Sequence, residues 1–135
     1  MPMNSAFPIR QPCPPGACIC GLEELRTAVD ADLRIVRLTR MEERKLLERL
    51  ERIDSLADLQ HMCRRMEEQL GIRLEIGPGF NEVRTMRGIS IQVHELPGLC
   101  RKTRQAIPAA IRRGMESTPQ IAFDLLNAND LLRDA

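Results

Sequence analysis

Aromatic residues are almost absent from this sequence. It has no tryptophan, no tyrosine and three phenylalanines. Proteins that bind single-stranded nucleic acid without sequence preference stack successive bases on aromatic side chains. A stacking platform of that kind is therefore nearly excluded. The hydrophobic core must be aliphatic, with Leu, Ile, Val and Met as the residues that fill it.

The sequence also lacks a long hydrophobic run and a strong net charge. No apolar stretch approaches the roughly 18 residues that cross a bilayer, and residues 1–12 contain no apolar segment typical of a secretory signal. We therefore expect a cytoplasmic protein that does not associate with membranes. The net charge at pH 7 is +1, so the average field of the molecule does not attract nucleic acid or anionic lipid. An electrostatic partner must recognise a local patch.

The length of 135 residues suits one hydrophobic core and is short for two. Five of the nine prolines fall within residues 1–20, where their fixed backbone angle and missing N–H oppose a helix. We therefore predict a Pro/Cys-rich N-terminal arm over residues 1–21 and a single α+β domain over residues 22–135.

The first elements of that domain are predicted from composition and spacing. Residues 33–38, LRIVRL, are rich in branched side chains and predict a leading strand. Thr39 and Glu42 then form a T-x-x-E capping box, in which each side chain can satisfy a backbone amide at the helix start. Leucines at helical spacing follow, and they predict a helix over about residues 40–53.

A second apolar stripe at helical spacing comes after a short connection. Asp54 or Ser55 can cap its start, and Gly71 supplies a C-terminal stop. Two helices joined so tightly are expected to pack as an antiparallel hairpin. Cys63 lies on the apolar stripe, where a thiol behaves as a small hydrophobe, so we assign it to the core.

After the second helix, the apolar residues alternate with polar ones. The alternating segments are 72–76, 83–85 and 89–93, and turn sequences separate them. This pattern predicts a three-stranded antiparallel meander with one buried face.

Two C-terminal helices complete the predicted α+β fold. The first begins after Pro97-Gly98, and Pro108 is expected to restart or kink it. Thr118 and Pro119 open the second, whose apolar residues face the core. The full order is a leading strand, a helical hairpin, a meander and these two helices.

Three of the cysteines crowd into CPPGACIC, residues 13–20. Cys13, Cys18 and Cys20 follow the spacing CxxxxCxC, and Cys100 lies in a second loop-like stretch, PGLC. Four thiolates can form a tetrahedral zinc site or hold an iron–sulfur cluster if the fold brings them together. The stretch resembles the cluster loop of plant-type ferredoxins, CxxxxCxxC with a distant fourth cysteine, although the last gap is one residue shorter here. A small metalloprotein that uses these four cysteines is one hypothesis for the function.

The same thiols allow two other interpretations. An odd number of cysteines, 5, without a secretory signal does not suggest a disulfide framework. Neighbouring thiols can serve redox chemistry, so a thiol redox protein is a further hypothesis. Loop and core thiols without a metal are the simpler explanation, because structural zinc sites usually show paired CxxC arms and this chain has no second arm.

From Pro97 to Met115 the chain has no acidic residue. The basic residues of this segment are Arg101, Lys102, Arg104, Arg112 and Arg113. If two helical pieces meet at Pro108, these basic residues can lie on one face. Such a face would hold several phosphates or dock an acidic protein surface. An ordinary solvated helix face is the plainer explanation. No helix-turn-helix, finger or RNP spacing accompanies the charges, so base-specific readout is not expected.

No complete catalytic signature is present. His61 and His94 have no nucleophile at a spacing that implies general acid–base catalysis. The turn GPGF, residues 77–80, lacks the lysine and hydroxyl of a phosphate loop. We therefore expect a non-catalytic binding or regulatory protein, and nucleic acid is the first candidate for its partner. The residues expected to dock the partner are Arg101, Lys102, Arg104, Arg112 and Arg113.

Overall fold

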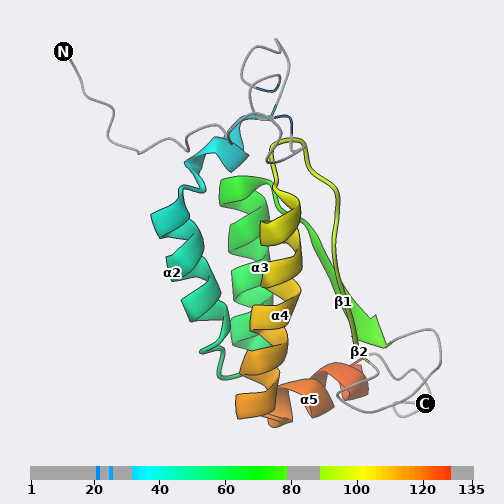
Figure 1. The fold of residues 1–135 in the computed structure, drawn as a ribbon. Coiled ribbons are helices and arrows are strands. Elements are labelled where there is room, and N and C mark those ends of the chain that lie inside the picture. Colours follow the sequence, from blue (N-terminus) through cyan, green and yellow to red (C-terminus); the bar gives the residue numbers. More distant parts are fainter. Residues whose placement is uncertain (1–20, 22–24, 26–31, 79–88, 129–135) are drawn as a thin grey trace.

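The computed structural model describes residues 21, 25, 32–78 and 89–128. In chain order its elements are the 3₁₀ helix η1 (Arg34–Arg37), helices α2 (Arg40–Leu50) and α3 (Leu56–Leu70), strands β1 (Leu74–Pro78) and β2 (Ile89–Val93), and helices α4 (Arg101–Ser117) and α5 (Gln120–Ala128). Helices α2, α3 and α4 stand side by side, and strands β1 and β2 lie along one flank of them (Figure 1). The described chain is therefore α+β, as predicted. Most of the predicted arm, residues 1–20, lies outside the described residues.

The predicted N-cap of α2 is confirmed, but only one half of the capping box forms, because the Thr39 amide donates to the Arg37 carbonyl oxygen at 3.0 Å and not to the Glu42 side chain. Thr39 Oγ1 accepts a hydrogen bond from the backbone amide of Glu42 at 3.2 Å. The Glu42 carboxylate lies 3.9 Å from Lys45 Nζ, on the next turn of the helix. The helix ends at Leu50, about one turn earlier than predicted.

Helix α3 also has the predicted ends. Ser55 Oγ accepts a hydrogen bond from the Asp58 amide at 3.0 Å. At the other end Gly71 has a φ of 77°, a left-handed conformation that glycine adopts without a steric penalty. Arg49 Nη2 lies 2.5 Å from Asp58 Oδ1, and this hydrogen-bonded pair lowers the pKa of Asp58. The contact joins the end of α2 to the start of α3, so the two helices form the predicted antiparallel hairpin (Figure 1).

The predicted leading strand over residues 33–38 is wrong, because Arg34–Arg37 form the 3₁₀ helix η1. Side chains two residues apart in a strand point to the same face. Here Ile35 is 0% exposed and Leu33 is 44% exposed. The branched residues that suggested a strand therefore serve to anchor a helical turn on the core.

Arg34 fixes η1 against the end of α3. Its Nη1 donates to the carbonyl oxygens of Glu67 at 2.8 Å and of Glu68 at 3.3 Å. Such carbonyls at a helix C-terminus lack partners within the helix. Arg34 also hydrogen-bonds the Asp32 carboxylate, and this contact lowers the pKa of Asp32 to about 2. The arginine thus caps α3 from a segment more than thirty residues away in sequence.

The two described strands pair directly and antiparallel, with Leu74 opposite Val93 and Ile76 opposite Ile91. In the predicted meander, residues 83–85 would separate these strands, so the three-stranded arrangement is wrong. Residues 83–85 themselves lie outside the described residues. The apolar face of the β1–β2 sheet packs toward α4 and α5.

Helix α4 is continuous, with Pro108 inside it. Near its start, Thr103 Oγ1 donates a hydrogen bond to the Glu43 carboxylate of α2. Near its end, Arg113 Nη2 lies 2.8 Å from Glu51 Oε2, just after α2. Helices α2 and α4 therefore run parallel to each other.

The core of the described residues contains only aliphatic and methionine side chains, as the composition predicted. Its largest fully buried members are Ile35, Leu50, Ile53, Leu59, Ile72, Ile89, Ile107, Ile111, Met115 and Ile121. They come from η1, from helices α2 to α5, from strand β2 and from the connections between elements, so all of these parts share one core. In the part of the chain that the structure describes, no helix combines the length and apolarity needed to cross a membrane.

Candidate partner-binding surface

The basic residues of α4 divide into two rows along the helix. Successive residues of an α-helix are about 100° apart around its axis. Lys102 and Arg113 therefore lie within about 20° of each other around the axis of α4. Arg113 contacts Glu51 at the end of α2, so this row faces α2. Arg101, Arg104 and Arg112 follow the other side of the helix, where their row faces β2.

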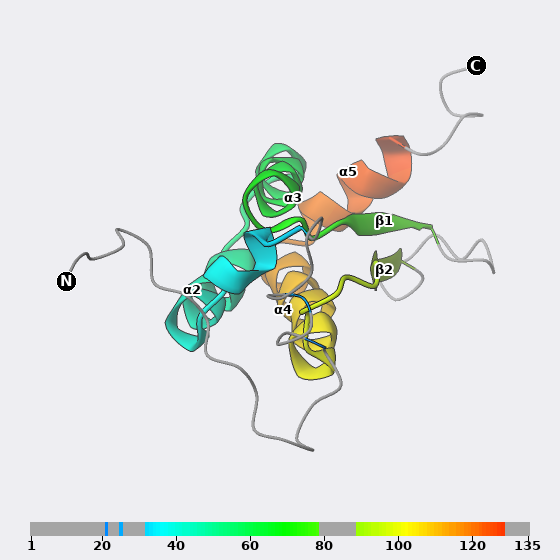
Figure 2. The same ribbon diagram turned by 90° about the horizontal axis from the view of Figure 1, so that it is seen from above.

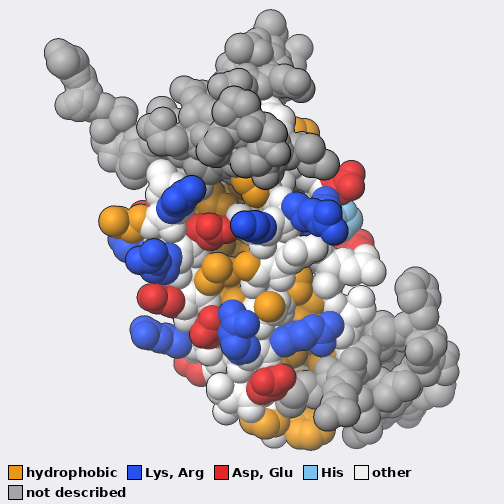
Figure 3. Space-filling model, in the orientation of Figure 1, with side chains coloured by type: hydrophobic (Ala, Val, Ile, Leu, Met, Phe, Trp, Pro, Cys, Tyr) orange, Lys and Arg blue, Asp and Glu red, His pale blue; other side chains and the backbone are white. Residues whose placement is uncertain are grey.

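The row facing α2 is extended by two arginines of α2 itself. Arg40 and Arg44 are one turn apart, and both lie within about 20° of Glu51 around the axis of α2. We call the surface formed by Arg40, Arg44, Lys102 and Arg113 the α2–α4 face. All four side chains are exposed. Figure 3 shows Lys and Arg side chains gathered over these helices, with acidic side chains among them.

The charges of the α2–α4 face are only partly neutralised. Arg113 pairs with Glu51 at 2.8 Å. Among the described residues, Arg40, Arg44 and Lys102 form no ion pair. Three positive charges therefore remain available to an anionic partner.

The row facing β2 makes more contacts within the protein. Arg112 Nη2 donates to the carbonyl oxygen of Ile89 at 2.9 Å. Arg104 Nη1 lies 3.4 Å from Glu95 Oε1, and the Glu95 side chain is 90% exposed. An exposed pair of this kind contributes less than about 1 kcal/mol and exchanges readily with other ions. Arg101 is exposed at the start of the helix.

Sequence reasoning missed Arg40 and Arg44. The helix that carries them has acidic and basic residues in near balance, which is typical of a solvated face. The i, i+4 spacing of the two arginines was the available signal, because it places them on the same side of a helix. Which neighbour that side meets depends on the packing of α2 against α4.

The proposed metal ligands are not brought together within the described residues. Cys13, Cys18 and Cys20 lie outside them. Cys100 is half-buried at the N-cap of α4, where its carbonyl oxygen accepts from the Arg104 amide at 2.9 Å. The described part of the chain contains no group of three or more His, Cys, Asp or Glu residues placed to hold a metal ion. Zinc or iron–sulfur binding therefore stays a prediction.

Elemental analysis of the purified full chain tests this prediction. If Cys13, Cys18, Cys20 and Cys100 hold a metal, the protein contains about one structural zinc or the iron and colour of a cluster. The double substitution Cys18→Ser and Cys20→Ser is expected to remove that metal. Cys63→Ser is the matched control, because Cys63 is half-buried against the core and burial raises the pKa of its thiol. A colourless, metal-free protein with the same unfolding temperature in chelator contradicts the hypothesis.

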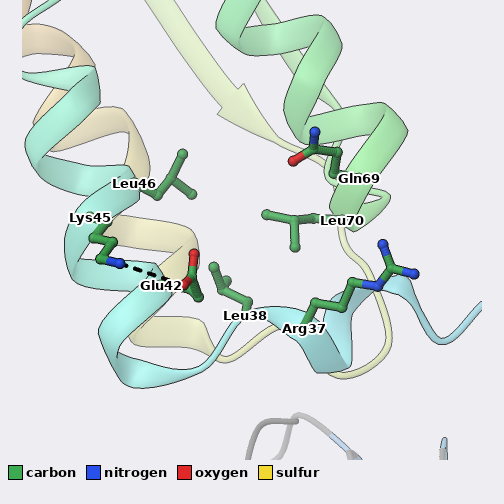
Figure 4. Close-up of a pocket in the computed structure, with 7 residues that line it drawn as sticks. All are labelled: Arg37, Leu38, Glu42, Lys45, Leu46, Gln69 and Leu70. Carbon is green, nitrogen blue, oxygen red and sulfur yellow. Dashed lines mark ion pairs between the residues drawn. The ribbon is translucent and has the colours of Figure 1, made fainter. Parts of the chain in front are cut away.

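Neither described histidine lines the pocket at the end of α3. His61 is exposed on α3, and His94 Nε2 lies 3.3 Å from Glu75 Oε1 on the outer face of the sheet. A pocket of about 510 Å³ lies between η1, α2 and the end of α3. Figure 4 shows Leu38, Leu46 and Leu70 around it, with Lys45 turned toward Glu42. Its lining contains no histidine or thiol.

No protein-family model matches the chain, and comparisons with curated proteins and solved structures give no match. The chemistry of the exposed surfaces is therefore the basis for inferring function.

Proposed function

We propose that this is a non-catalytic binding protein that docks an anionic partner through the α2–α4 face. Nucleic acid is the first candidate for that partner. The observation that carries the proposal is the exposure of Arg40, Arg44 and Lys102 on adjacent parallel helices, without ion pairs among the described residues. Cations that are not neutralised within the protein bind phosphates and release the condensed counterions of nucleic acid.

The dimensions of the α2–α4 face suit a phosphate backbone. Arg113 is neutralised by Glu51, so the available charges are those of Arg40, Arg44 and Lys102. Arg40 and Arg44 are about 6 Å apart along the axis of α2, and Lys102 lies across from them, next to Thr103, which bonds Glu43. One strand of a duplex presents a phosphate about every 3.4 Å along its axis, so about three phosphate contacts are expected. Contacts to phosphates carry no base information, so binding is expected to be independent of sequence.

The metalloprotein and thiol redox hypotheses remain alternatives that depend on Cys13, Cys18 and Cys20. These residues lie outside the described part of the chain. No contact of the described residues favours either hypothesis over the anionic-partner proposal. The α2–α4 face can be tested independently of them, because none of its four side chains is a cysteine.

The test compares two triple variants of the full chain binding to mixed-sequence DNA across a series of salt concentrations. Substituting Arg40, Arg44 and Lys102 with glutamine is expected to weaken binding at low salt by about tenfold or more. The slope of log K against log salt is expected to fall in magnitude by about 2–3, close to one per lost phosphate contact. Arg52, Arg64 and Arg65 are also exposed, and their substitution with glutamine is the matched control.

Two results contradict the proposal. One is absence of measurable binding by the parent protein at low salt. The other is an equal loss in the two triple variants, because that would mean that net charge and not the α2–α4 face controls binding. Thermal unfolding of both variants, followed by circular dichroism, verifies that each is folded.

A further inference from the structure

The pocket at the open end of the α2–α3 hairpin is bounded by three elements. Because the two helices are antiparallel, the first turns of α2 lie beside the last turn of α3. Figure 2, which views the molecule from this end, shows η1 between the two helices. The pocket of about 510 Å³ lies among these three elements. Its volume falls within the range of about 300–1,000 Å³ that is typical of small-molecule sites.

The floor of the pocket is aliphatic. Leu38 follows η1, Leu46 belongs to the second turn of α2, and Leu70 is the last residue of α3. Leu38 is buried, whereas Leu46 and Leu70 are half-buried against the core. Figure 4 shows the three side chains around one space. An apolar molecule in this space would remove leucine surface from water, which favours binding in proportion to the area covered.

The backbone around this floor is held in place by contacts of other residues. Arg34 Nη1 donates to the carbonyl oxygens of Glu67 and Glu68, and these contacts fix η1 on the end of α3. Thr39 caps the start of α2, and Gly71 ends α3 in the left-handed conformation. A ligand therefore meets a preformed site, and its binding does not bear the cost of ordering these elements.

The opening of the pocket carries more positive than negative charge. Its charged side chains are Arg37 of η1 and Glu42 and Lys45 of α2. All three are exposed, so the pocket opens to solvent. Figure 4 shows Arg37 and Lys45 on opposite sides of the leucines. Two cations with a single carboxylate favour a ligand that has a negatively charged head group.

Lys45 is placed to contact such a head group. Its Nζ lies 3.9 Å from Glu42 Oε1, and the two side chains are 65% and 47% exposed. An ion pair that is both long and exposed is weak and exchanges readily with other ions. A ligand carboxylate can therefore replace Glu42 as the partner of Lys45.

We propose that this pocket binds a small aliphatic carboxylate, with its hydrocarbon chain on Leu38, Leu46 and Leu70 and its carboxylate on Lys45. A ligand of this class matches both the apolar floor and the excess positive charge at the opening. The site is separate from the α2–α4 face, because the described lining of the pocket contains none of the four residues of that face.

The binding test titrates octanoate, below its micelle concentration, into the full chain and follows methyl chemical shifts by NMR. Saturable shifts are expected for the methyl groups of Leu38, Leu46 and Leu70, whereas those of Leu126 on α5 stay unchanged. Hexanoate is expected to bind about tenfold more weakly than octanoate, because each buried CH₂ contributes a factor of about four. Octylammonium, which has the opposite charge, is expected to bind about fivefold more weakly or worse.

Variants of the protein test the contact to the head group. Lys45→Gln is expected to weaken octanoate binding by about fivefold. Glu42→Gln removes the competing carboxylate and is expected to strengthen octanoate binding by about two- to fivefold. The Arg40, Arg44 and Lys102 glutamine variant is the matched control. It loses three positive charges but no residue of the described lining, and it is expected to bind octanoate as the parent does.

Four results would overturn the proposal. The first is the absence of saturable shifts at Leu38, Leu46 and Leu70, and the second is binding of octylammonium as tight as that of octanoate. The third is an unchanged octanoate affinity in Lys45→Gln, because the carboxylate would then not contact Lys45. The fourth is an equal loss of octanoate binding in Lys45→Gln and in the triple variant, because net charge would then control binding.

Discussion

Substitution of Gly114 by valine is expected to lower the free energy of unfolding by about 3 kcal/mol. A Cβ atom at this position would lie 2.6 Å from the backbone oxygen of Leu50 and 2.7 Å from Ile53 Cγ1. The first of these neighbours is backbone, so a rotamer change cannot relieve the clash. Helix α4 must move away from the end of α2, and that movement disturbs the buried contacts between the two helices.

Urea denaturation followed by circular dichroism measures this effect. Gly77→Ala is the control, because a Cβ at Gly77 has no heavy atom within 4 Å, and its stability is expected to change by less than about 1 kcal/mol. A Gly114→Val protein as stable as the parent would contradict the close approach of α4 to the end of α2. The result also bears on the α2–α4 face, since that face exists only where these helices meet.

Substitution of Ile35 by alanine is expected to cost about 2–5 kcal/mol of folding free energy. The Ile35 side chain is 0% exposed, and its truncation leaves a cavity under η1. Leu33→Ala is expected to cost less than about 1 kcal/mol, because Leu33 is 44% exposed.

The pair of variants discriminates between η1 and the strand that the sequence predicted. In a strand, Leu33 and Ile35 would face the same way, and both truncations would have similar costs. Unfolding free energies from urea titrations of the two proteins provide the comparison. Similar losses would support a strand, whereas the large difference is expected for a 3₁₀ turn that buries Ile35 alone.

The helix boundaries could be predicted because their signals are local. Thr39 and Ser55 cap the helices that follow them, and Gly71 ends α3 in the left-handed conformation. Each of these interactions joins groups within about four residues of one another. Neighbouring sequence is then sufficient to specify the backbone.

The candidate site was only partly predictable, for a physical reason. The charge run of α4 is visible in the sequence, but its division into two rows depends on the helix continuing through Pro108. The contribution of Arg40 and Arg44 depends on α2 packing parallel to α4, and the contacts that align these helices join residues about sixty positions apart. No spacing rule within a single segment contains that information.

The sequence by itself determined the aliphatic composition of the core, the caps of the hairpin helices and the concentration of basic residues near the C-terminal end. These follow from residue type and from interactions over a few positions. Only the tertiary structure decided that Arg34 caps α3 from η1, that β1 pairs directly with β2, and that the basic residues of α4 face two different neighbours. Each of these depends on which distant segments pack together, because burial and long-range pairing override the weak local preference of a short branched or alternating stretch.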